Sequence, residues 1–369
     1  MSNSVFSSAA LRGGRLARLL RCAFCGLLAA LLCSTALSAA AEKSKTLQIY
    51  FVDVEGGQAT LFVTPEGKSL LIDTGWPGFD GRDADRIVAV AKLAGIAKID
   101  FVLLTHNHVD HTGGVPQLAA KIPVATFIDH GENREPGDAD TQRAWQAYQA
   151  LLAKGNFKRI IAKPGDDLPV VGVQVKVISA DGALLEKPLP GAGGANPACN
   201  TAPQPPADQT ENARSLGVLL TFGKLRILDL GDLTKDKERE LVCPVNRLGR
   251  IDIYVVSHHG WSQSNSPLFL DSIAPRVAIM DNGAAKGGSP SSWDAIEKSP
   301  RLEDLWQLHF SDEGGASHNV ADSFIANSTG PDAGNYLKLT VFSDGSFDVY
   351  NARTQATKHY APKSGNQAR

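Results

Sequence analysis

The sequence is poor in cysteine, in long apolar runs and in positive charge. Five cysteines occur among 369 residues, and a chain of this length can bury a core without a disulfide framework. After residue 41, no apolar stretch is long enough for a bilayer span of roughly 20 residues. The motif G-x-S-x-G is absent, which argues against the serine mechanism of an α/β-hydrolase. The composition is otherwise that of an ordinary globular protein.

The N-terminal segment differs from the rest of the chain. It carries four arginines, then the apolar stretch CAFCGLLAALLCSTALS and the small residues SAAA. This order is typical of a secretory signal peptide, so we expect residues 1–41 to be removed by cleavage near Ala39 to Ala41. An uncleaved membrane anchor is the alternative, and a lipoprotein anchor is disfavoured because Leu32 precedes Cys33. We expect a periplasmic or secreted protein without stable membrane insertion.

Removal of the segment changes the charge. The four arginines leave with it, so 33 of the 37 basic residues remain against 39 acidic ones, a net charge of −6. Such a surface is not the electrostatic footprint of a duplex-binding protein, and we expect a small-molecule or nucleotide-type substrate. Cys199 and Cys243 remain as well. They can pair in an oxidising compartment, or they can be two unrelated thiols.

The pattern of apolar residues predicts an α/β domain over residues 45–360, followed by a polar tail at 361–369. The expected strands of the first half cover residues 47–54, 59–64, 69–75, 99–105 and 124–129, with helices at 83–96, 113–122 and 139–155. The second half repeats the alternation, with strands or hairpins at 173–180, 215–232, 251–260 and 336–352. Residues 184–209, rich in Pro and Gly, are expected to form a surface loop. This order favours two sheets packed face to face with helices outside.

A cluster of polar residues follows one of the predicted strands. The stretch LLTHNHVDHTGG, residues 103–114, places His106, His108, Asp110 and His111 within six positions. Packing does not require such a cluster, and imidazole together with carboxylate suits zinc and related ions. On an irregular turn, His106 and His108 can hold one ion while Asp110 and His111 face a second.

Other strand ends supply further donors. Asp73 ends the third predicted strand, Asp232 ends the hairpin, and His258 and His259 follow the strand that begins at residue 251. Functional groups gather in loops held by a rigid scaffold. Asp232 can bridge two ions, and His258 can complete the set.

These residues carry a resemblance to a known family. THNHVDH is similar to the HxHxDH signature of the metallo-β-lactamase superfamily. The flanking stretches DVEGGQATLFVTPEGKSLLIDTG, ENARSLGVLLTFGKLRILDLGD and VSHHGWSQSNS resemble motifs of its ComEC-type branch, the extracellular domain of DNA-uptake channels. The resemblance implies an αββα four-layer sandwich of two mixed β-sheets. It also implies a hydrolase with one or two metal ions, zinc first, with manganese or iron(II) as alternatives.

The resemblance also assigns roles, residue by residue. The ligands it implies are His106, His108, Asp110, His111 and Asp232, with either His258 or His259 as the late histidine ligand. Of these two we prefer His258 as the ligand, because it directly follows the predicted strand. Asp73 would orient the ligands without binding the metal itself. His259 would contact the substrate, and Asp110 would also help to orient the attacking water or protonate the leaving group.

The sequence departs from the family pattern in two places. Where the superfamily often has another histidine, this chain reads ISADG at 178–182. His130 is an alternative donor, or a loop histidine near the substrate. The stretch DVEGGQA replaces the GQGD loop that is more frequent in the branch. Both departures bear on metal number and substrate.

Several further residues receive weaker assignments. Asn212 and Ser215 are expected to support the loop of the site, and Ser262 and Ser264 to line the pocket. His309 and His318 lie in the segment HFSDEGGASH. We expect them at the surface, with an approach to the site as the alternative.

The leading hypothesis is a secreted metal-dependent hydrolase in which a metal-activated water attacks a phosphodiester, as in a nuclease or phosphodiesterase. A lactone, ester or β-lactam hydrolase on the same site is the first alternative. A binding protein with a decayed metal site is the alternative from another class.

Overall fold

The computed structural model describes residues 46–330 and 332–363. The expected signal peptide and most of the polar tail lie outside the described residues. Among those described, no helix combines the length and apolarity that crossing a bilayer requires.

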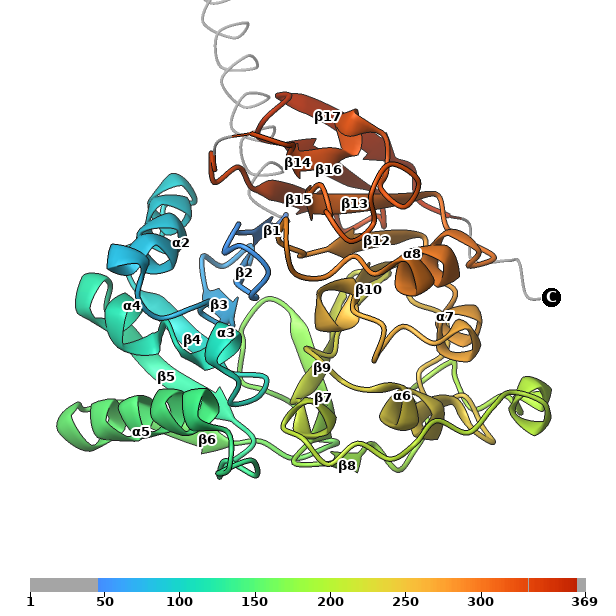
Figure 1. Ribbon diagram of the computed structural model, residues 1–369, viewed down its shortest axis with the longest axis horizontal. Helices are drawn as coiled ribbons and strands as arrows, with labels where there is room; N and C mark the ends of the chain where they lie inside the picture. Colours follow the sequence, from blue (N-terminus) through green and yellow to red (C-terminus); the bar gives the residue numbers. More distant parts are fainter. Residues whose placement is uncertain (1–45, 331, 364–369) are drawn as a thin grey trace, which may run out of the picture. The chain divides into compact units, whose positions relative to one another are not determined.

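Two β-sheets form the centre of the domain (Figure 1). The first sheet consists of β1 (Leu47–Phe51), β2 (Thr60–Val63), β3 (Ser69–Ile72), β4 (Ile99–Leu103), β5 (Val124–Asp129), β6 (Lys158–Ile161), β15 (Leu337–Val341), β16 (Phe347–Asn351) and β17 (Ala356–Tyr360). The second sheet consists of β7 (Gln174–Ala180), β8 (Ala183–Leu184), β9 (Gly217–Phe222), β10 (Leu225–Asp229), β11 (Ile253–Val255), β12 (Val277–Met280), β13 (Asp304–His309) and β14 (Ile325–Asn327).

Both sheets are mixed. The first runs in the order β17-β16-β15-β1-β2-β3-β4-β5-β6, antiparallel up to β3 and parallel from β3 to β6. The second runs β14-β13-β12-β11-β10-β9-β7-β8 and is parallel from β10 to β14. In each sheet the parallel strands end at a common edge, which brings together loops far apart in the sequence.

Helices cover the outer faces of both sheets (Figure 1). The longer ones are α2 (Arg82–Leu93), α4 (Val115–Lys121) and α5 (Ala139–Lys154) on the first sheet, and α6 (Lys235–Val242), α7 (Pro267–Ile273) and α8 (Pro290–Glu297) on the second. Short helical turns are α3 (Val109–Thr112), η1 (Phe79–Gly81), η2 (Pro197–Asn200), η3 (Asn212–Arg214), η4 (Ser257–Gly260) and η5 (Asp322–Phe324). The predicted αββα sandwich is confirmed.

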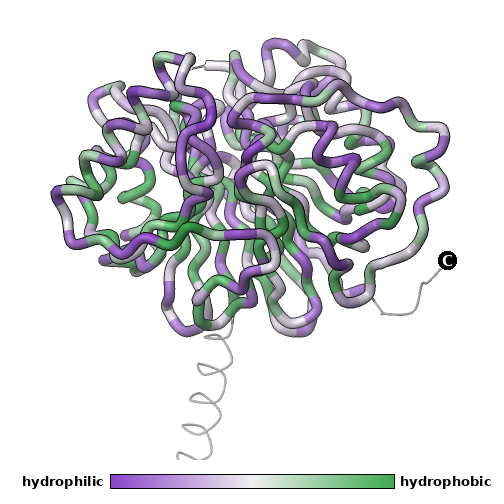
Figure 2. Tube along the Cα trace, turned by 90° about the horizontal axis from the view of Figure 1, so that it is seen from below, coloured by the Kyte–Doolittle hydropathy of each residue, from purple (hydrophilic) through white to green (hydrophobic). Residues whose placement is uncertain are grey.

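Strand β1 shows how the layers are built. Leu47, Ile49 and Phe51 belong to the core between the sheets, whereas Tyr50 belongs to the core under the helices. Because side chains alternate along a strand, a strand buried on both faces reads as a continuous apolar run. Figure 2 shows many hydrophobic stretches of the chain running through the interior and many hydrophilic stretches at the periphery.

Several predicted elements differ in detail from the structure. The predicted helix 113–122 begins at Val115, and the chain already makes the helical turn α3 before it. The predicted strand 251–260 is limited to β11, because the chain turns into η4 after Val256. The hairpin around FGK and the final hairpin with its Asp-Gly turn are present, and β17 extends the latter.

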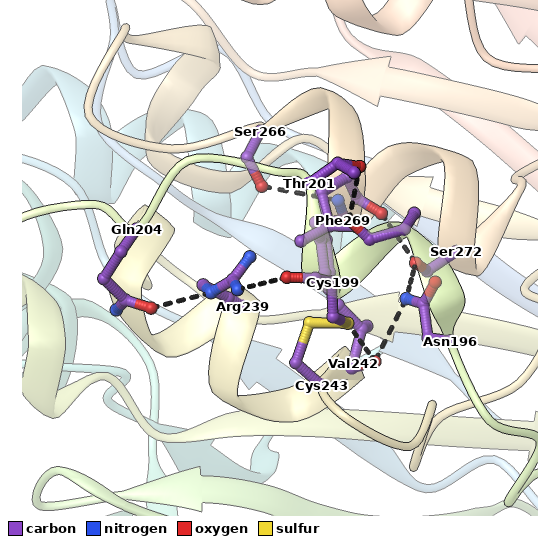
Figure 3. Close-up of a disulfide and its surroundings, with 12 residues drawn as sticks. Asn196, Cys199, Thr201, Gln204, Arg239, Val242, Cys243, Ser266, Phe269 and Ser272 are labelled. Atoms are coloured by element: carbon purple, nitrogen blue, oxygen red, sulfur yellow. Dashed lines mark hydrogen bonds between the residues drawn. A yellow bond between two sulfur atoms is a disulfide. The ribbon is translucent and has the colours of Figure 1, made fainter.

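Cys199 and Cys243 form a disulfide, with their Cα atoms 5.8 Å apart (Figure 3). The bond ties the loop 184–209 to the end of α6. Arg239 strengthens the attachment, because its guanidinium donates to the carbonyl of Cys199 and to the side chain of Gln204. Of the two interpretations of these cysteines, the structure supports the pair.

Candidate metal centre

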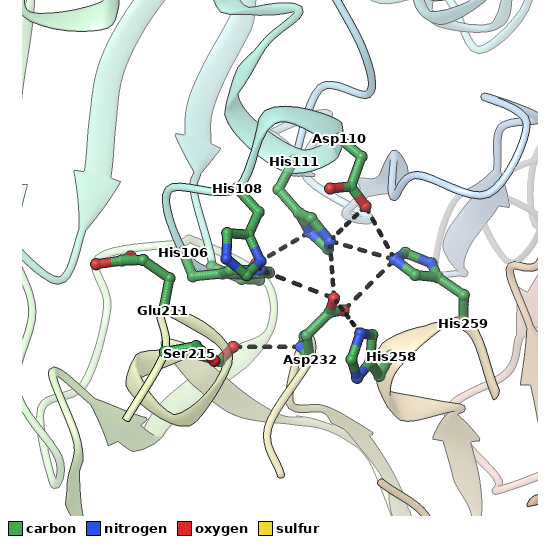
Figure 4. Close-up of polar contacts among 12 residues, drawn as sticks. His106, His108, Asp110, His111, Glu211, Ser215, Asp232, His258 and His259 are labelled. Carbon is green, nitrogen blue, oxygen red and sulfur yellow. Dashed lines mark hydrogen bonds and ion pairs between the residues drawn. The ribbon is translucent and has the colours of Figure 1, made fainter. Parts of the chain in front are cut away.

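The histidine cluster lies where β4 ends and α3 begins. His106 and His108 precede α3, and Asp110 and His111 lie in its first turn, so the four side chains lie on the same side of the site, around Asp232 (Figure 4). An irregular turn was predicted for all four residues. The last two are instead placed by a helix.

The second sheet contributes the facing residues. Asp232 follows β10, and its backbone N–H donates to the Ser215 hydroxyl at 3.2 Å, which confirms the supporting role expected of that serine. His258 and His259 lie in η4 with φ values of 56° and 53°. These are left-handed conformations, which cost energy in residues with a Cβ and cluster at functional sites.

The centre contains two groups of donors. The ligand atoms of the second donor group converge on one position, and its members are four buried residues: Asp110, His111, Asp232 and His259. The Nε2 atom of His111 lies 3.2 Å from Asp110 Oδ2 and 3.3 Å from Asp232 Oδ2. The Nε2 atom of His259 lies 3.3 Å from Asp110 Oδ2 and 3.2 Å from His111 Nε2. Ligands arranged tetrahedrally at about 2.0–2.1 Å from zinc lie roughly 3.4 Å apart, so the group has the dimensions of a zinc site.

The first donor group consists of His106, His108 and Asp232. His106 Nε2 lies 3.0 Å from His108 Nδ1 and 3.8 Å from Asp232 Oδ2. The side chain of His108 is 21% exposed, so this group opens toward solvent. Three protein donors with an open side are typical of catalytic zinc sites. Asp232 belongs to both groups, as expected of a bridging carboxylate.

Residues behind the donors hold the imidazoles in place. Asp73 accepts from His111 Nδ1 at 2.7 Å and from the Thr105 hydroxyl at 2.6 Å. Glu135 Oε2 lies 3.1 Å from His108 Nε2. A carboxylate on the far nitrogen of a metal-binding histidine fixes its tautomer and raises its basicity. Asp73 therefore lies where the sequence analysis expected it, whereas Glu135 was not predicted.

The charges of the centre favour a cation. Burial opposes ionisation of Asp232, but the neighbouring histidines, His111 first, hold its pKa well below the ordinary value. Burial also opposes charge on His111, yet Asp232 and Asp110 raise the pKa of this imidazole well above its usual range. Burial and the nearby His111 lower the pKa of His106. A metal ion would displace the proton of His111 and take over its role as counter-charge.

The order of the two late histidines differs from the expectation. His259, assigned to the substrate, lies in the second donor group, while His258, assigned as a ligand, lies outside both groups. His258 Nε2 is 3.4 Å from Asp232 Oδ2, and its Nδ1 is buried without a hydrogen-bond partner among the described residues. Burial lowers the pKa of His258 to about 4, so this ring is neutral at pH 7.

His130 does not join either donor group. Its Nε2 lies 3.0 Å from the buried carboxylate of Glu211, which also accepts from the backbone N–H of Asn107. Glu211 thereby fixes the loop that carries His106 and His108, and its own N–H donates to Glu135. Asn212 and Ser215 of the motif ENARSL were predicted to support the site, whereas Glu211 beside them was not.

Two weaker assignments are wrong. His309 is buried, and its Nε2 lies 2.6 Å from Asp53 Oδ1, so it packs behind the DVEGGQA loop instead of at the surface. Ser264 is buried and donates to the carbonyl of Leu233, so its hydroxyl supports the backbone and does not line a pocket. Ser262 is exposed, and the side chain of His318 is 28% exposed.

The DVEGGQA loop reaches the centre through its backbone. Gln58 N–H donates to the carbonyl of Asp110 at 3.3 Å. A Cβ atom on Gly57 would lie 2.4 Å from that same oxygen, so only glycine allows this approach. The loop thus supports α3 although it departs from the more frequent branch motif.

Sheets face to face, outer helices and donor groups in the loops at the strand ends define an αββα metal-dependent hydrolase. The family model described as "Metallo-beta-lactamase superfamily" matches residues 52–196. Over this stretch the chain is similar to the metallo-β-lactamase superfamily.

Two curated relatives are similar over longer stretches, and a third over a shorter one. The chain is 26% identical over 271 residues to "Recombination protein 2" of Haemophilus influenzae, covering 72% of this chain and 27% of that protein. It is 26% identical over 250 residues to "ComE operon protein 3" of Bacillus subtilis, covering 64% of this chain and 28% of that protein. A "UPF0173 metal-dependent hydrolase" of Herpetosiphon aurantiacus is 41% identical over 76 residues, 20% of this chain and 29% of that protein. The chain thus spans about a quarter of the length of the first two relatives, and their names support the ComEC-type branch.

Proposed function

We propose that this chain is a two-metal phosphodiesterase that works outside the cytoplasm. The observation that carries the proposal is the pair of donor groups joined by the shared carboxylate of Asp232. Two-metal sites are suited to phosphoryl chemistry, because they stabilise both the attacking and the leaving oxygen. The motif resemblance to the ComEC-type branch of DNA-uptake proteins favours a phosphodiester as the substrate, and the similarity to "Recombination protein 2" and "ComE operon protein 3" over more than 60% of the chain supports that branch.

The residues divide the work as follows. Divalent ions, when bound, supply Lewis-acid charge and acidify water. His106, His108 and Asp232 would hold one ion, and Asp110, His111, Asp232 and His259 the other. Asp73 and Glu135 keep the far nitrogens of His111 and His108 protonated, so that the opposite nitrogens stay free to bind metal.

His258 takes the substrate-side role that the sequence analysis gave to His259. It is neutral, buried and outside both donor groups, and its Nε2 lies beside the shared carboxylate. A neutral imidazole there can accept a proton from water or return one to the leaving alkoxide. Asp110 keeps its proposed part in orienting the attacking water, although its Oδ2 atom also belongs to the second donor group.

The proposed location rests on two features. The first 41 residues have the pattern of a signal peptide, and the Cys199–Cys243 disulfide is typical of an oxidising compartment. Zinc is the proposed ion, because imidazole and carboxylate at these separations suit it, and manganese or iron(II) are the alternatives to test.

The test compares substrates with a metal-ligand variant. The purified protein, loaded with zinc or manganese, is assayed on bis(p-nitrophenyl) phosphate and short single-stranded DNA, then on lactone, ester and β-lactam substrates. We expect phosphodiester turnover that His108→Ala abolishes, together with loss of metal, and that the partly exposed control His318→Ala retains. Turnover of only the second set would overturn the phosphodiester assignment. Metal binding without any turnover would favour a binding protein.

A further inference from the structure

Lys286 lies against the second donor group but belongs to neither donor group. It belongs to the loop that follows β12, and its ammonium contacts Asp110 Oδ2 (side chain 17% exposed). The same oxygen lies 3.2 Å from His111 Nε2 and 3.3 Å from His259 Nε2. One carboxylate oxygen therefore faces both a lysine and the position where an ion would bind.

The lysine is held in place at both ends. Its Nζ lies 5.1 Å from the ring centre of Trp76 and 5.3 Å from that of Trp261, within the range of cation–π attraction. At the other end, a Cβ atom on Gly56 would lie 2.8 Å from Lys286 Cβ, so the stem packs closely on the DVEGGQA loop. Trp76 follows β3 and Asp73, and Trp261 directly follows η4, which contains His259. The position of the ammonium is thus fixed by the same elements that build the centre.

A protonated lysine cannot ligate a metal, because it has donors and no lone pair. Beside a metal ion its charge is repulsive and weakens ion binding. When a metal ion binds Asp110 and neutralises its carboxylate, the ammonium of Lys286 loses most of its counter-charge. It is then a hydrogen-bond donor, directed at the reaction centre and still partly open to solvent, that lacks an anionic partner.

We propose that Lys286 is the positioning residue for the anionic oxygen of the substrate, and that it binds a non-bridging oxygen of the phosphodiester above the second donor group. The proposal rests on the proposed function for the identity of the anion. A carboxylate of a β-lactam offers the same chemistry and is distinguished by experiment. The ammonium of Lys286 repels a metal ion and attracts an anion. Removal of this lysine should therefore strengthen metal binding and weaken anion binding.

The experiment measures zinc affinity and phosphate affinity in the same variants. Lys286→Met should bind zinc in the second group as tightly as the wild type or more tightly, and bind inorganic phosphate about 10- to 100-fold more weakly in the zinc-loaded protein. The KM for bis(p-nitrophenyl) phosphate should rise more than kcat falls. Lys286→Arg should recover most of the phosphate affinity. Lys338→Met, which removes a lysine from the face of Tyr50, serves as the control.

Two results would overturn the proposal. Parallel loss of zinc and phosphate in Lys286→Met would show that the lysine only supports the loop, and unchanged phosphate affinity would show that it binds no anion. Weaker phosphate binding in the variant, in a protein that hydrolyses β-lactams and no phosphodiester, would refute the proposed function while leaving the anion role of Lys286 intact. Phosphodiester turnover by the wild-type protein, together with unchanged phosphate affinity in Lys286→Met, would support the proposed function and refute the anion role of Lys286.

Discussion

Replacement of Asp73 by asparagine should selectively lower the affinity of the second donor group for its metal ion. Asp73 has φ 60°, and asparagine tolerates this left-handed conformation, so the backbone should remain in place. The amide keeps an oxygen for the Thr105 N–H, 2.8 Å away, but presents a donor to His111 Nδ1. His111 then loses the acceptor that holds its proton on the far nitrogen.

The structure sets the size of this effect. A hydrogen bond to a charged group contributes about 1.5–3 kcal/mol, which corresponds to about 10- to 100-fold in affinity for the second ion. Such losses are typical when the partner of a metal-binding histidine is removed. Asp73 contacts no member of the first donor group directly. It reaches that group through Thr105, which lies 3.0 Å from His106 Nδ1, and through His111, which lies 3.3 Å from the shared Asp232, so the affinity of the first group should change less.

Competition with a chromophoric chelator yields the two stepwise zinc affinities for this test. Asp236→Asn, a buried aspartate that accepts from Thr234 and Asp208, is the matched control. The reasoning would be refuted if an Asp73→Asn protein that unfolds at the wild-type temperature lost affinity equally at both zinc sites, or lost none at either.

Two further predictions concern stability. Cys199→Ser should lower the free energy of unfolding by about 4 kcal/mol in the chain-entropy model, because the disulfide spans a sequence separation of 44 residues. Denaturant titration measures this free energy, and a loss below about 1 kcal/mol would contradict the prediction. Burial raises the pKa of Asp229 to about 7, so the folded state keeps a proton that the unfolded state releases above pH ~4, and this stabilising contribution is lost as pH rises through 7. In metal-free protein, Asp229→Asn should therefore gain on the order of 2–4 kcal/mol over the wild type between pH 5 and pH 8, whereas parallel pH profiles would show that Asp229 is not protonated in the fold.

The sequence predicted the donors that follow strands, because local signals mark them. His106 to His111 form a dense cluster after an apolar run, and Asp232 ends a clear hairpin. Parallel strands bring such loops to one edge, so the strand pattern was sufficient to gather them. The layers of the fold followed from the same pattern, whereas the pairing of β1 with β15, between residues nearly 300 positions apart, has no local signal.

What the sequence could not show depends on contacts between distant loops. Glu135 and Lys286 lie in polar loops whose approach to the centre is set by packing. The order of His258 and His259 was missed because both residues adopt a left-handed conformation, which turns the second ring toward Asp110. His309 was expected at the surface because its partner Asp53 lies 256 residues away.

The most direct test of the account is the metal content of the purified protein together with that of Asp232→Ala. Asp232 is the residue that both donor groups share, so elemental analysis should find near two equivalents of zinc or manganese in the wild type and loss of both ions in the variant. A wild type that binds one ion or none under saturating metal, or a variant that keeps both, would contradict the two-metal centre on which the proposed function rests.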